Sequence, residues 1–210
     1  MQPRKHHRRR RIGILGGTFN PPHLAHLVIA EECRQNRDLD EVWFLPTGRP
    51  PHKKVPQLAD GKLRVSMLEE LIQAADGLSV CPVELDRPGP SYTVDTLEAL
   101  HQRHPAYDWY FIIGSDMITY FNTWHRFHDL QNLVTFITVM RPGYTLDDLP
   151  QFHSCFSPAA WRKLQRFQTV TPQMEISSTK IRERIRQHRP VWHLTGHEVA
   201  SFIDRHSLYV

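Results

Sequence analysis

Short apolar runs alternate with amphipathic stretches along most of this chain, and the alternation limits its fold more than any other feature. The runs are rich in Val, Ile, Phe and Trp, and several are apolar throughout, as strands buried on both faces of a sheet are. Between them, apolar residues recur at helical spacing, as Val65, Leu68 and Leu71 do. The pattern predicts an α/β fold with a doubly wound, mainly parallel sheet. The predicted strands span residues 11–15, 41–46, 78–84, 108–114, 134–140 and, more weakly, 168–176.

The length of the chain suits one domain. Its 210 residues predict a single domain at 11–210, with a small helical part toward the C-terminus. In that part Ser157 followed by Pro158 has the pattern of a helix start, and Thr195 with Glu198 has the spacing of a capping box. Residues 142–156 lack a clear period and are predicted to be a loop or a poor helix.

The positive charge of the chain belongs to its beginning. The formal net charge is +4, but six Lys and Arg residues lie within the first eleven positions, which leaves 20 basic and 22 acidic side chains elsewhere. Residues 1–10 are therefore predicted to be a disordered basic arm. A mildly acidic body without a recognition motif argues against nucleic acid as a partner, and the arm would bind phosphates weakly at most.

Neither a membrane span nor an export signal is expected. The best apolar run, 133–140, is too short for a bilayer and is broken by threonines. The basic start resembles a signal peptide, but the polar and proline-rich segment 20–23 interrupts the apolar stretch too early. Three well-separated cysteines, Cys33, Cys81 and Cys155, fit a reducing compartment, so a cytoplasmic location is expected.

Residues 16–27 lie where an open parallel sheet binds ligands, directly after the first predicted strand and before a helix. Gly16 and Gly17 allow a phosphate to approach the backbone closely. His23 and His26 share one side of the first helical turn, where the helix dipole already favours anions. Each feature alone also fits an ordinary turn or helix cap, but together they predict a polyphosphate site.

A second predicted anion site follows the last strand-like run. Ser177, Ser178 and Thr179 place three hydroxyls at a helix start, and Arg182 lies one turn further on. A capped helix with an exposed arginine would show the same residues. The dinucleotide pattern Gly-x-Gly-x-x-Gly and the P-loop pattern are both missing from the sequence, which excludes a standard dehydrogenase and a P-loop kinase.

Both segments resemble signatures of the nucleotidyltransferase superfamily. Residues 16–26 resemble the Gly-Gly-Thr-Phe-Asp-Pro-Pro-His-x-Gly-His signature of bacterial nicotinate-mononucleotide adenylyltransferases, and residues 176–182 match their Ile-Ser-Ser-Thr-x-x-Arg motif. Asn20 replaces the usual Asp and Ala25 the usual Gly. Class I aminoacyl-tRNA synthetases share the first signature, but their Lys-Met-Ser-Lys-Ser element does not occur here.

Shorter elements between the two motifs also resemble this family, so that the likeness runs from about residue 11 to residue 209. They are a Pro-Pro-His-Lys loop at 50–53, Ser-Tyr-Thr at 91–93, Gly-x-Asp at 114–116 and Thr-Trp at 123–124. The resemblance implies that Thr93 lies near the pyridine carboxylate and that Trp124 stacks on the pyridine ring. Taken singly, a core tryptophan at 124, a helix cap at Asp116 and a solvated Lys53 stay open.

The resemblance implies a Rossmann-like nucleotidyltransferase fold with two neighbouring substrate sites. The implied ATP site comprises Gly16, Gly17, Thr18, Phe19, His23, His26, Gly114, Asp116, Ile176, Ser177, Ser178, Thr179 and Arg182. The implied mononucleotide site comprises Asn20, His52, Lys53, Tyr92, Thr93, Asp116, Trp124 and His125. The implied catalytic residues are His23, His26, Lys53 and Arg182, and no side chain is expected to ligate a metal.

The implied reaction joins nicotinate mononucleotide to the AMP part of ATP, giving nicotinate adenine dinucleotide and pyrophosphate in NAD biosynthesis. Mg²⁺ is expected on the ATP phosphates. The attacking phosphate is already anionic, so catalysis is expected from positioning and charge stabilisation. The alternatives are a preference for nicotinamide mononucleotide, a phosphopantetheine enzyme and a non-catalytic nucleotide sensor. A homo-oligomer stays open.

Overall fold

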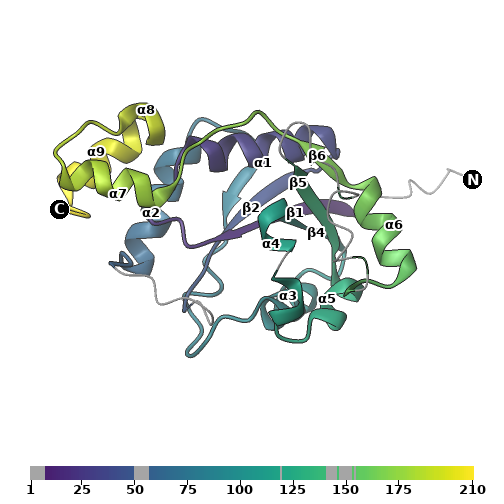
Figure 1. Cartoon of the computed structure of the whole chain (residues 1–210). Helices are drawn as coiled ribbons and strands as arrows, with labels where there is room; N and C mark the ends of the chain where they lie inside the picture. Colours follow the sequence, from purple (N-terminus) through teal and green to yellow (C-terminus); the bar gives the residue numbers. More distant parts are fainter. Residues whose placement is uncertain (1–7, 50–56, 119, 141–145, 147–152, 154) are drawn as a thin grey trace, which may run out of the picture.

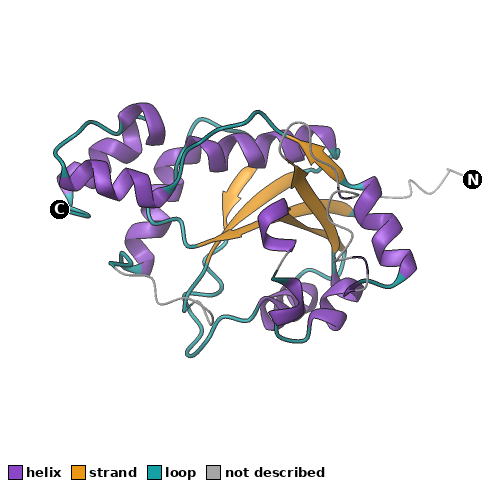
Figure 2. Cartoon of the chain, in the orientation of Figure 1, coloured by secondary structure: helices purple, strands orange, loops and turns teal. Residues whose placement is uncertain are grey.

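The computed structural model describes residues 8–49, 57–118, 120–140, 146, 153 and 155–210, without the side chains of Asp116 and Asn122. A twisted sheet stands at the centre of these residues, with helices on both of its faces (Figure 1 and Figure 2). The elements in chain order are β1 (Arg10–Gly17), α1 (Leu24–Asn36), β2 (Glu41–Pro46), α2 (Gly61–Ile72), β3 (Leu78–Val80), α3 (Thr93–Arg103), β4 (Tyr107–Gly114), α4 (Ser115–Ile118), the 3₁₀ helix η1 (Phe121–Thr123), α5 (Phe127–Leu133), β5 (Thr135–Met140), α6 (Pro158–Arg166), β6 (Gln168–Val170), α7 (Ser178–Arg186), α8 (Trp192–Thr195) and α9 (His197–Arg205).

The sheet has six parallel strands in the order β3-β2-β1-β4-β5-β6, which confirms the predicted doubly wound architecture. The first strand, β1, lies in the middle of the sheet. β2 and β3 follow on one side of it, and β4, β5 and β6 follow on the other. Gly16 pairs with Leu45 of β2, and Leu15 pairs with Ile112 of β4. The carboxyl ends of these strands therefore meet where the strand order reverses, which is the edge at which open α/β sheets bind ligands.

Two hydrophobic cores, one on each face, hold the helices against the sheet. Successive residues of β4 alternate between them: Phe111 and Ile113 enter the core with α3, α5 and α6, and Ile112 enters the core with α1, α2, α7 and α9. This burial on both faces explains why the strands are continuous apolar runs in the sequence. It also places α7, which carries the second motif, on the same face as α1, which follows the first.

Two strands end earlier than predicted. The strand expected at 78–84 stops at Val80, because Pro82 has no N–H for the ladder and its carbonyl accepts the N–H of Leu85 in a turn. The weak strand expected at 168–176 stops at Val170. The segment 142–156, predicted as a loop or poor helix, lies mostly outside the described residues, which include only 146, 153, 155 and 156 of it.

The predicted disordered arm is wrong for residues 8–10. Arg10 already belongs to β1, Arg8 pairs with Asp40 at 2.7 Å, and Arg9 pairs with Asp108 at 2.7 Å. These guanidinium groups find carboxylates at the amino end of the sheet, so the fold begins before residue 11. Residues 1–7 of the predicted arm lie outside the described residues.

The two predicted helix starts near the C-terminus have different outcomes. Ser157 caps α6 as expected, since its hydroxyl accepts the N–H of Ala160, with Pro158 in the first turn. The capping box at Thr195 is wrong, because Thr195 is the last residue of α8 and Gly196, with a φ of 88°, caps α9. A positive φ favours glycine over threonine at this junction. None of the helices in the described part is long and apolar enough to cross a membrane.

Candidate active site

The loop after β1 is held in a compact shape by the packing of Phe19. Phe19 is 1% exposed and has a φ of 47°, and its ring packs edge-on against His26 with centroids 4.9 Å apart. A Cβ on Gly17 would lie 3.1 Å from this ring, which is a tight contact, so glycine suits that position. The predicted ATP contact of Phe19 is therefore open to its backbone alone, while its ring supports a predicted catalytic histidine.

His23 and His26 stack on each other at the start of α1. Their ring centroids are 3.7 Å apart and the planes differ by 19°. His23 is the N-cap residue, and its backbone N–H donates to Nδ1 of His26 at 3.2 Å. Since Nδ1 of His26 accepts this bond, the proton of the neutral ring lies on Nε2.

Both imidazoles are neutral at pH 7. Burial lowers the pKa of His23 to about 4. Burial first, and the neighbouring His23 second, hold the pKa of His26 well below its usual value. Nδ1 of His23 is buried and has no hydrogen-bond partner within the described residues. The pair therefore offers neutral hydrogen-bond donors rather than cations, together with a buried nitrogen that a ligand could satisfy.

The side chain of Asn20, predicted to contact the mononucleotide, is buried and engaged by other protein groups in this structure. Asn20 is 1% exposed. Its Oδ1 accepts the N–H of Ala59 at 3.0 Å and the hydroxyl of Tyr209 at 2.8 Å, and its Nδ2 donates to the carbonyl of Gln57 at 3.1 Å. An amide can make all three bonds, whereas a carboxylate has no donor for Gln57. Asn20 thus joins three segments beneath the loop.

Hydrogen bonds join the second motif directly to the first. Ser177 caps α7, since its hydroxyl accepts the N–H of Lys180. The hydroxyl of Ser178 donates to the carbonyl of Pro21 at 2.8 Å, and Nη1 of Arg182 donates to the carbonyl of Asn20 at 2.7 Å. The structure thus brings the two predicted anion sites together, although these residues lie about 160 positions apart in the chain.

A cavity of about 460 Å³ opens beside these two motifs, at the carboxyl ends of β4 and β5. Three predicted ATP residues, Gly114, Ile176 and Ser177, line it, and so does Ala25. Ala25, which stands at the position of the family's glycine, is therefore part of the cavity wall. Lys180, from the first turn of α7, supplies a cation at its rim.

A second group of predicted residues gathers at the start of α3. Tyr92 precedes α3, Thr93 is its first residue, and the ring of Tyr92 lies 4.4 Å from that of His125. Trp124 packs edge-on against Phe111 of β4, with centroids 5.9 Å apart, and is partly buried on that core. Four of the eight residues predicted for the mononucleotide site, Tyr92, Thr93, Trp124 and His125, thus lie in two neighbouring segments.

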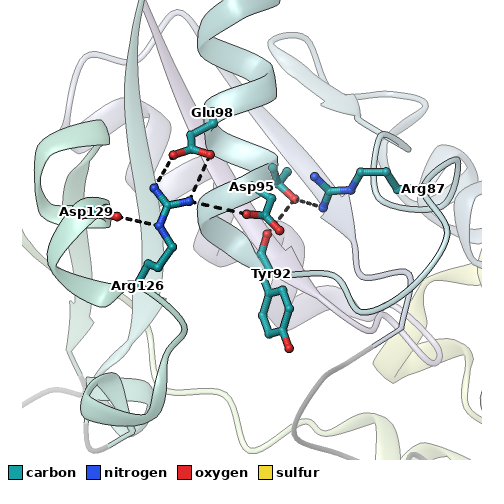
Figure 3. A network of polar contacts seen from close by, with 7 residues as sticks. Arg87, Tyr92, Asp95, Glu98, Arg126 and Asp129 are labelled. Carbon is teal, nitrogen blue, oxygen red and sulfur yellow. Dashed lines mark hydrogen bonds and ion pairs between the residues drawn. The ribbon is translucent and has the colours of Figure 1, made fainter.

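Arg126 fastens the Trp124–His125 turn to α3. Its guanidinium pairs with Glu98 and Asp129 at 2.7 Å and with Asp95 at 3.9 Å (Figure 3). Arg126 has a φ of 51°, an uncommon conformation for a residue with a long side chain. The network in Figure 3 therefore connects the turn to the helix that begins beside Tyr92.

Comparison with known proteins agrees with this geometry. A family model described as cytidylyltransferase-like matches residues 14–184. A Bacillus pumilus protein named "Probable nicotinate-nucleotide adenylyltransferase" is 42% identical over 200 residues, which cover 95% of this chain and 98% of that one. A Halalkalibacterium halodurans protein of the same name is 40% identical over 201 residues, covering 95% and 91%. The chain belongs to the nicotinate-nucleotide adenylyltransferase family. The predicted family and enzyme class are thereby confirmed.

The fold of this adenylyltransferase is also that of a solved relative. Nicotinic acid mononucleotide adenylyltransferase of Plasmodium falciparum, solved in complex with NaAD, superposes with a TM-score of 0.75 at 20% identity, over 95% of this chain and 97% of that one. A second structure of the same Plasmodium protein, complexed with APC, gives a TM-score of 0.72 at 19% identity. At such low identity the superposition supports the architecture alone, which is the predicted one.

Some predicted residues of the adenylyltransferase lie outside the described residues. His52 and Lys53 belong to the segment 50–56, and the side chain of Asp116, in α4, is likewise outside the described part. Within the residues that are described, no three His, Cys, Asp or Glu side chains gather to hold a metal ion.

The sequence analysis missed three residues that shape the site: Arg64, Lys180 and Tyr209. Arg64 is 2% exposed, and its guanidinium donates to the carbonyls of Thr18, Thr47 and Ala59 at 2.8–3.0 Å. Its signal was in the sequence, since Arg64 shares the core face of α2 with Leu68 and Leu71. Lys180 stood within the second motif, at a position where the family pattern allows any residue. Tyr209 gave no local signal.

Proposed function

We propose that this adenylyltransferase transfers AMP from MgATP to nicotinate mononucleotide in the cytoplasm. A phosphate oxygen of the mononucleotide attacks the α-phosphorus of ATP, the bond from that phosphorus to the bridging oxygen breaks, and pyrophosphate leaves with its electron pair. The products are nicotinate adenine dinucleotide and pyrophosphate. The observation that carries this proposal is the pair of bonds that joins the two phosphate motifs, from Arg182 to Asn20 and from Ser178 to Pro21, beside the cavity.

Both histidines are neutral at pH 7, and the ring of His26 carries its proton on Nε2. A neutral Nε2–H group donates a hydrogen bond to a phosphate oxygen and so stabilises the negative charge that develops there. Its position at the N-terminus of α1 adds the helix dipole to that effect. We assign His23 and His26 to the α- and β-phosphates and the leaving pyrophosphate.

The second motif would hold the outer phosphates of ATP. Thr179 is exposed, and Lys180 lies at the cavity rim, so both are accessible to the β- and γ-phosphates. The hydroxyl proton of Ser178 is already engaged by Pro21, so Ser178 would align α7 rather than donate to a phosphate. Arg182 would combine both roles, since one nitrogen binds Asn20 and the other lies 3.4 Å from Thr179.

The acceptor would occupy the region around Tyr92, Thr93, Trp124 and His125. An aromatic ring and a hydroxyl at one helix start suit an aromatic ring that bears a carboxylate. Lys53 is proposed to neutralise the attacking phosphate, and Asp116 to bind a ribose. The free thiols of Cys33, Cys81 and Cys155 support the reducing compartment.

The test is a pyrophosphate-release assay with MgATP that offers nicotinate mononucleotide and nicotinamide mononucleotide in parallel. We expect pyrophosphate release to show a higher kcat/KM for nicotinate mononucleotide than for nicotinamide mononucleotide. Equal or reversed preference would overturn the acceptor assignment. No release from folded protein would overturn the reaction and favour a nucleotide sensor.

Exchange of His23 for alanine tests the assignment of the donor. His23→Ala should lower kcat by roughly 10²–10³, the scale for losing one preorganised donor. The matched control is His193→Ala, which removes an exposed imidazole of α8 and should leave kcat unchanged. Near-normal turnover of the His23 variant would contradict the role.

A further inference from the structure

Tyr209 reaches from the end of the chain to the loop of the first motif. It follows α9, is 8% exposed, and packs into the core shared by α1 and α2. Its hydroxyl donates to Oδ1 of Asn20 at 2.8 Å, although the two residues are 189 positions apart. A buried tyrosine hydroxyl needs a hydrogen-bond partner, and here that partner is the side chain of a residue in the loop that carries His23.

The direction of this hydrogen bond is fixed by its surroundings. Oδ1 of Asn20 also accepts the N–H of Ala59, and Nδ2 of the same amide donates to Gln57. If the amide turned over, Nδ2 would face two donors and Oδ1 would face a carbonyl. Burial raises the pKa of Tyr209, so its hydroxyl stays protonated and remains the donor. Tyr209 therefore holds the Asn20 amide in one orientation.

Tyr209 completes a set of contacts that holds each part of the loop. Arg64 binds the carbonyl of Thr18, Arg182 binds the carbonyl of Asn20, and Ser178 binds the carbonyl of Pro21. In this set only Tyr209 and the segment 57–59 hold the Asn20 side chain. His23 follows three residues later, so the orientation of Asn20 is transmitted to the histidine over a very short stretch of chain.

The backbone of Tyr209 also has an uncommon conformation. Its φ is 67°, in the left-handed region that bulky residues rarely adopt. Such a conformation persists only where surrounding contacts hold it, and it is found disproportionately at functional sites. Here the conformation places the ring in the core and its hydroxyl on Asn20.

We infer that Tyr209 is a positioning residue for adenylyl transfer, whose hydroxyl acts through Asn20 to hold the loop that carries His23. The inference rests on the proposed function. Tyr209 is buried and its hydroxyl is engaged by Asn20, so its effect is on how often the loop presents His23 in the reactive geometry. Loss of the hydroxyl should therefore lower kcat and leave both KM values nearly unchanged.

The first experiment compares Tyr209→Phe with Tyr110→Phe. The control removes a hydroxyl that accepts a hydrogen bond from Arg11 at 3.0 Å, toward the amino end of β1 and away from the site. We expect Tyr209→Phe to lower kcat about fivefold, the size of one neutral hydrogen bond, with KM for both substrates within twofold. The control should retain full kcat. An unchanged kcat in the Tyr209 variant, or an equal fall in the control, would overturn the inference.

A double-mutant cycle tests the route through Asn20. In an Asn20→Ala background, the Tyr209 hydroxyl has lost its partner, so adding Tyr209→Phe should change kcat less than twofold. A further fivefold fall in that background would show that Tyr209 acts by another path. All variants are compared at a temperature where urea unfolding shows each of them to be folded.

Hydrogen exchange tests the inference without relying on activity. The backbone N–H of His26 bonds to the carbonyl of His23, and that of His23 bonds to the ring of His26. In Tyr209→Phe, both amides should exchange about fivefold faster than in the wild type, with α3 unaffected. Unchanged exchange would refute positioning even if the wild type released no pyrophosphate. If wild-type turnover failed while these amides did exchange faster, the proposed function and the predicted fall in kcat would be overturned, and the hold of Tyr209 on the loop would stand.

Discussion

Acid should weaken this protein through His23, and the size of the effect follows from the burial of that side chain. The unfolded imidazole binds a proton near pH 6.5, whereas the folded one does so only near pH 4. Since the folded pKa is the lower of the two, the unfolded state binds more protons between these values. The stability contributed by neutral His23 is therefore complete above about pH 6.5 and is lost as the pH falls toward 4.

The magnitude can be worked out for a convenient interval. Between pH 7.5 and pH 5.0, protonation of unfolded His23 lowers the free energy of unfolding by about 2 kcal/mol. His26 acts in the same direction, because its pKa is also lowered in the fold. The substitution His23→Asn removes the first contribution and keeps a side chain that can cap α1.

The assay is urea unfolding of the wild type, His23→Asn and His193→Asn at both pH values. The wild type and the His193 control, which changes an exposed residue of α8, should lose the same free energy on acidification. His23→Asn should lose about 2 kcal/mol less, since other titrating groups cancel in the comparison. Equal losses in all three proteins would refute the claim that His23 is held neutral by burial.

Two other substitutions test the contacts that surround the site. Arg64→Met removes the donor of three partly buried carbonyls, so it should lower the free energy of unfolding by about 3 kcal/mol and the Tm by roughly 6–12 °C. The control Arg205→Met removes the ion pair of an exposed arginine with Glu70 and should change the Tm by no more than about 2 °C. Similar melting of the two variants would refute the role of Arg64. Arg126→Ala removes the ion pairs with Glu98 and Asp129, so it should raise KM for the mononucleotide roughly threefold with little change in KM for ATP. Added salt should narrow the difference in KM between variant and wild type, and equal changes in both KM values would argue against a local effect at the acceptor region.

The sheet could be predicted from the sequence because its strands are buried on both faces. Uniform apolar runs such as 108–114 and 134–140 are typical of buried parallel strands, and their alternation with helical patterns favours a parallel order. The ends of strands and helices were harder to predict. The turn at Pro82 and the cap at Gly196 are decided by single residues that break an otherwise suitable local pattern.

For the site, too, residues within one segment could be predicted, whereas contacts between distant segments could not. His23, His26 and the second motif lie in contiguous segments, so the sequence could indicate them, first by chemistry and then by resemblance. The contacts that hold these segments together could not be predicted, because each joins residues far apart in the chain. Ser178 reaches Pro21, and Tyr209 reaches Asn20, across gaps for which no local pattern exists. Asn20 shows the consequence: its sequence position suggested a ligand contact, and its buried neighbours give it a structural one.

The most direct test of the account follows the α-phosphate itself. The protein is incubated with MgATP labelled at the α-phosphate and with nicotinate mononucleotide, and the labelled products are separated. The account predicts that the label appears in nicotinate adenine dinucleotide, in an amount equal to the pyrophosphate released, and that no label remains on the protein. Label recovered as free AMP, or bound covalently to the chain, would contradict direct transfer between two substrates held by these two motifs.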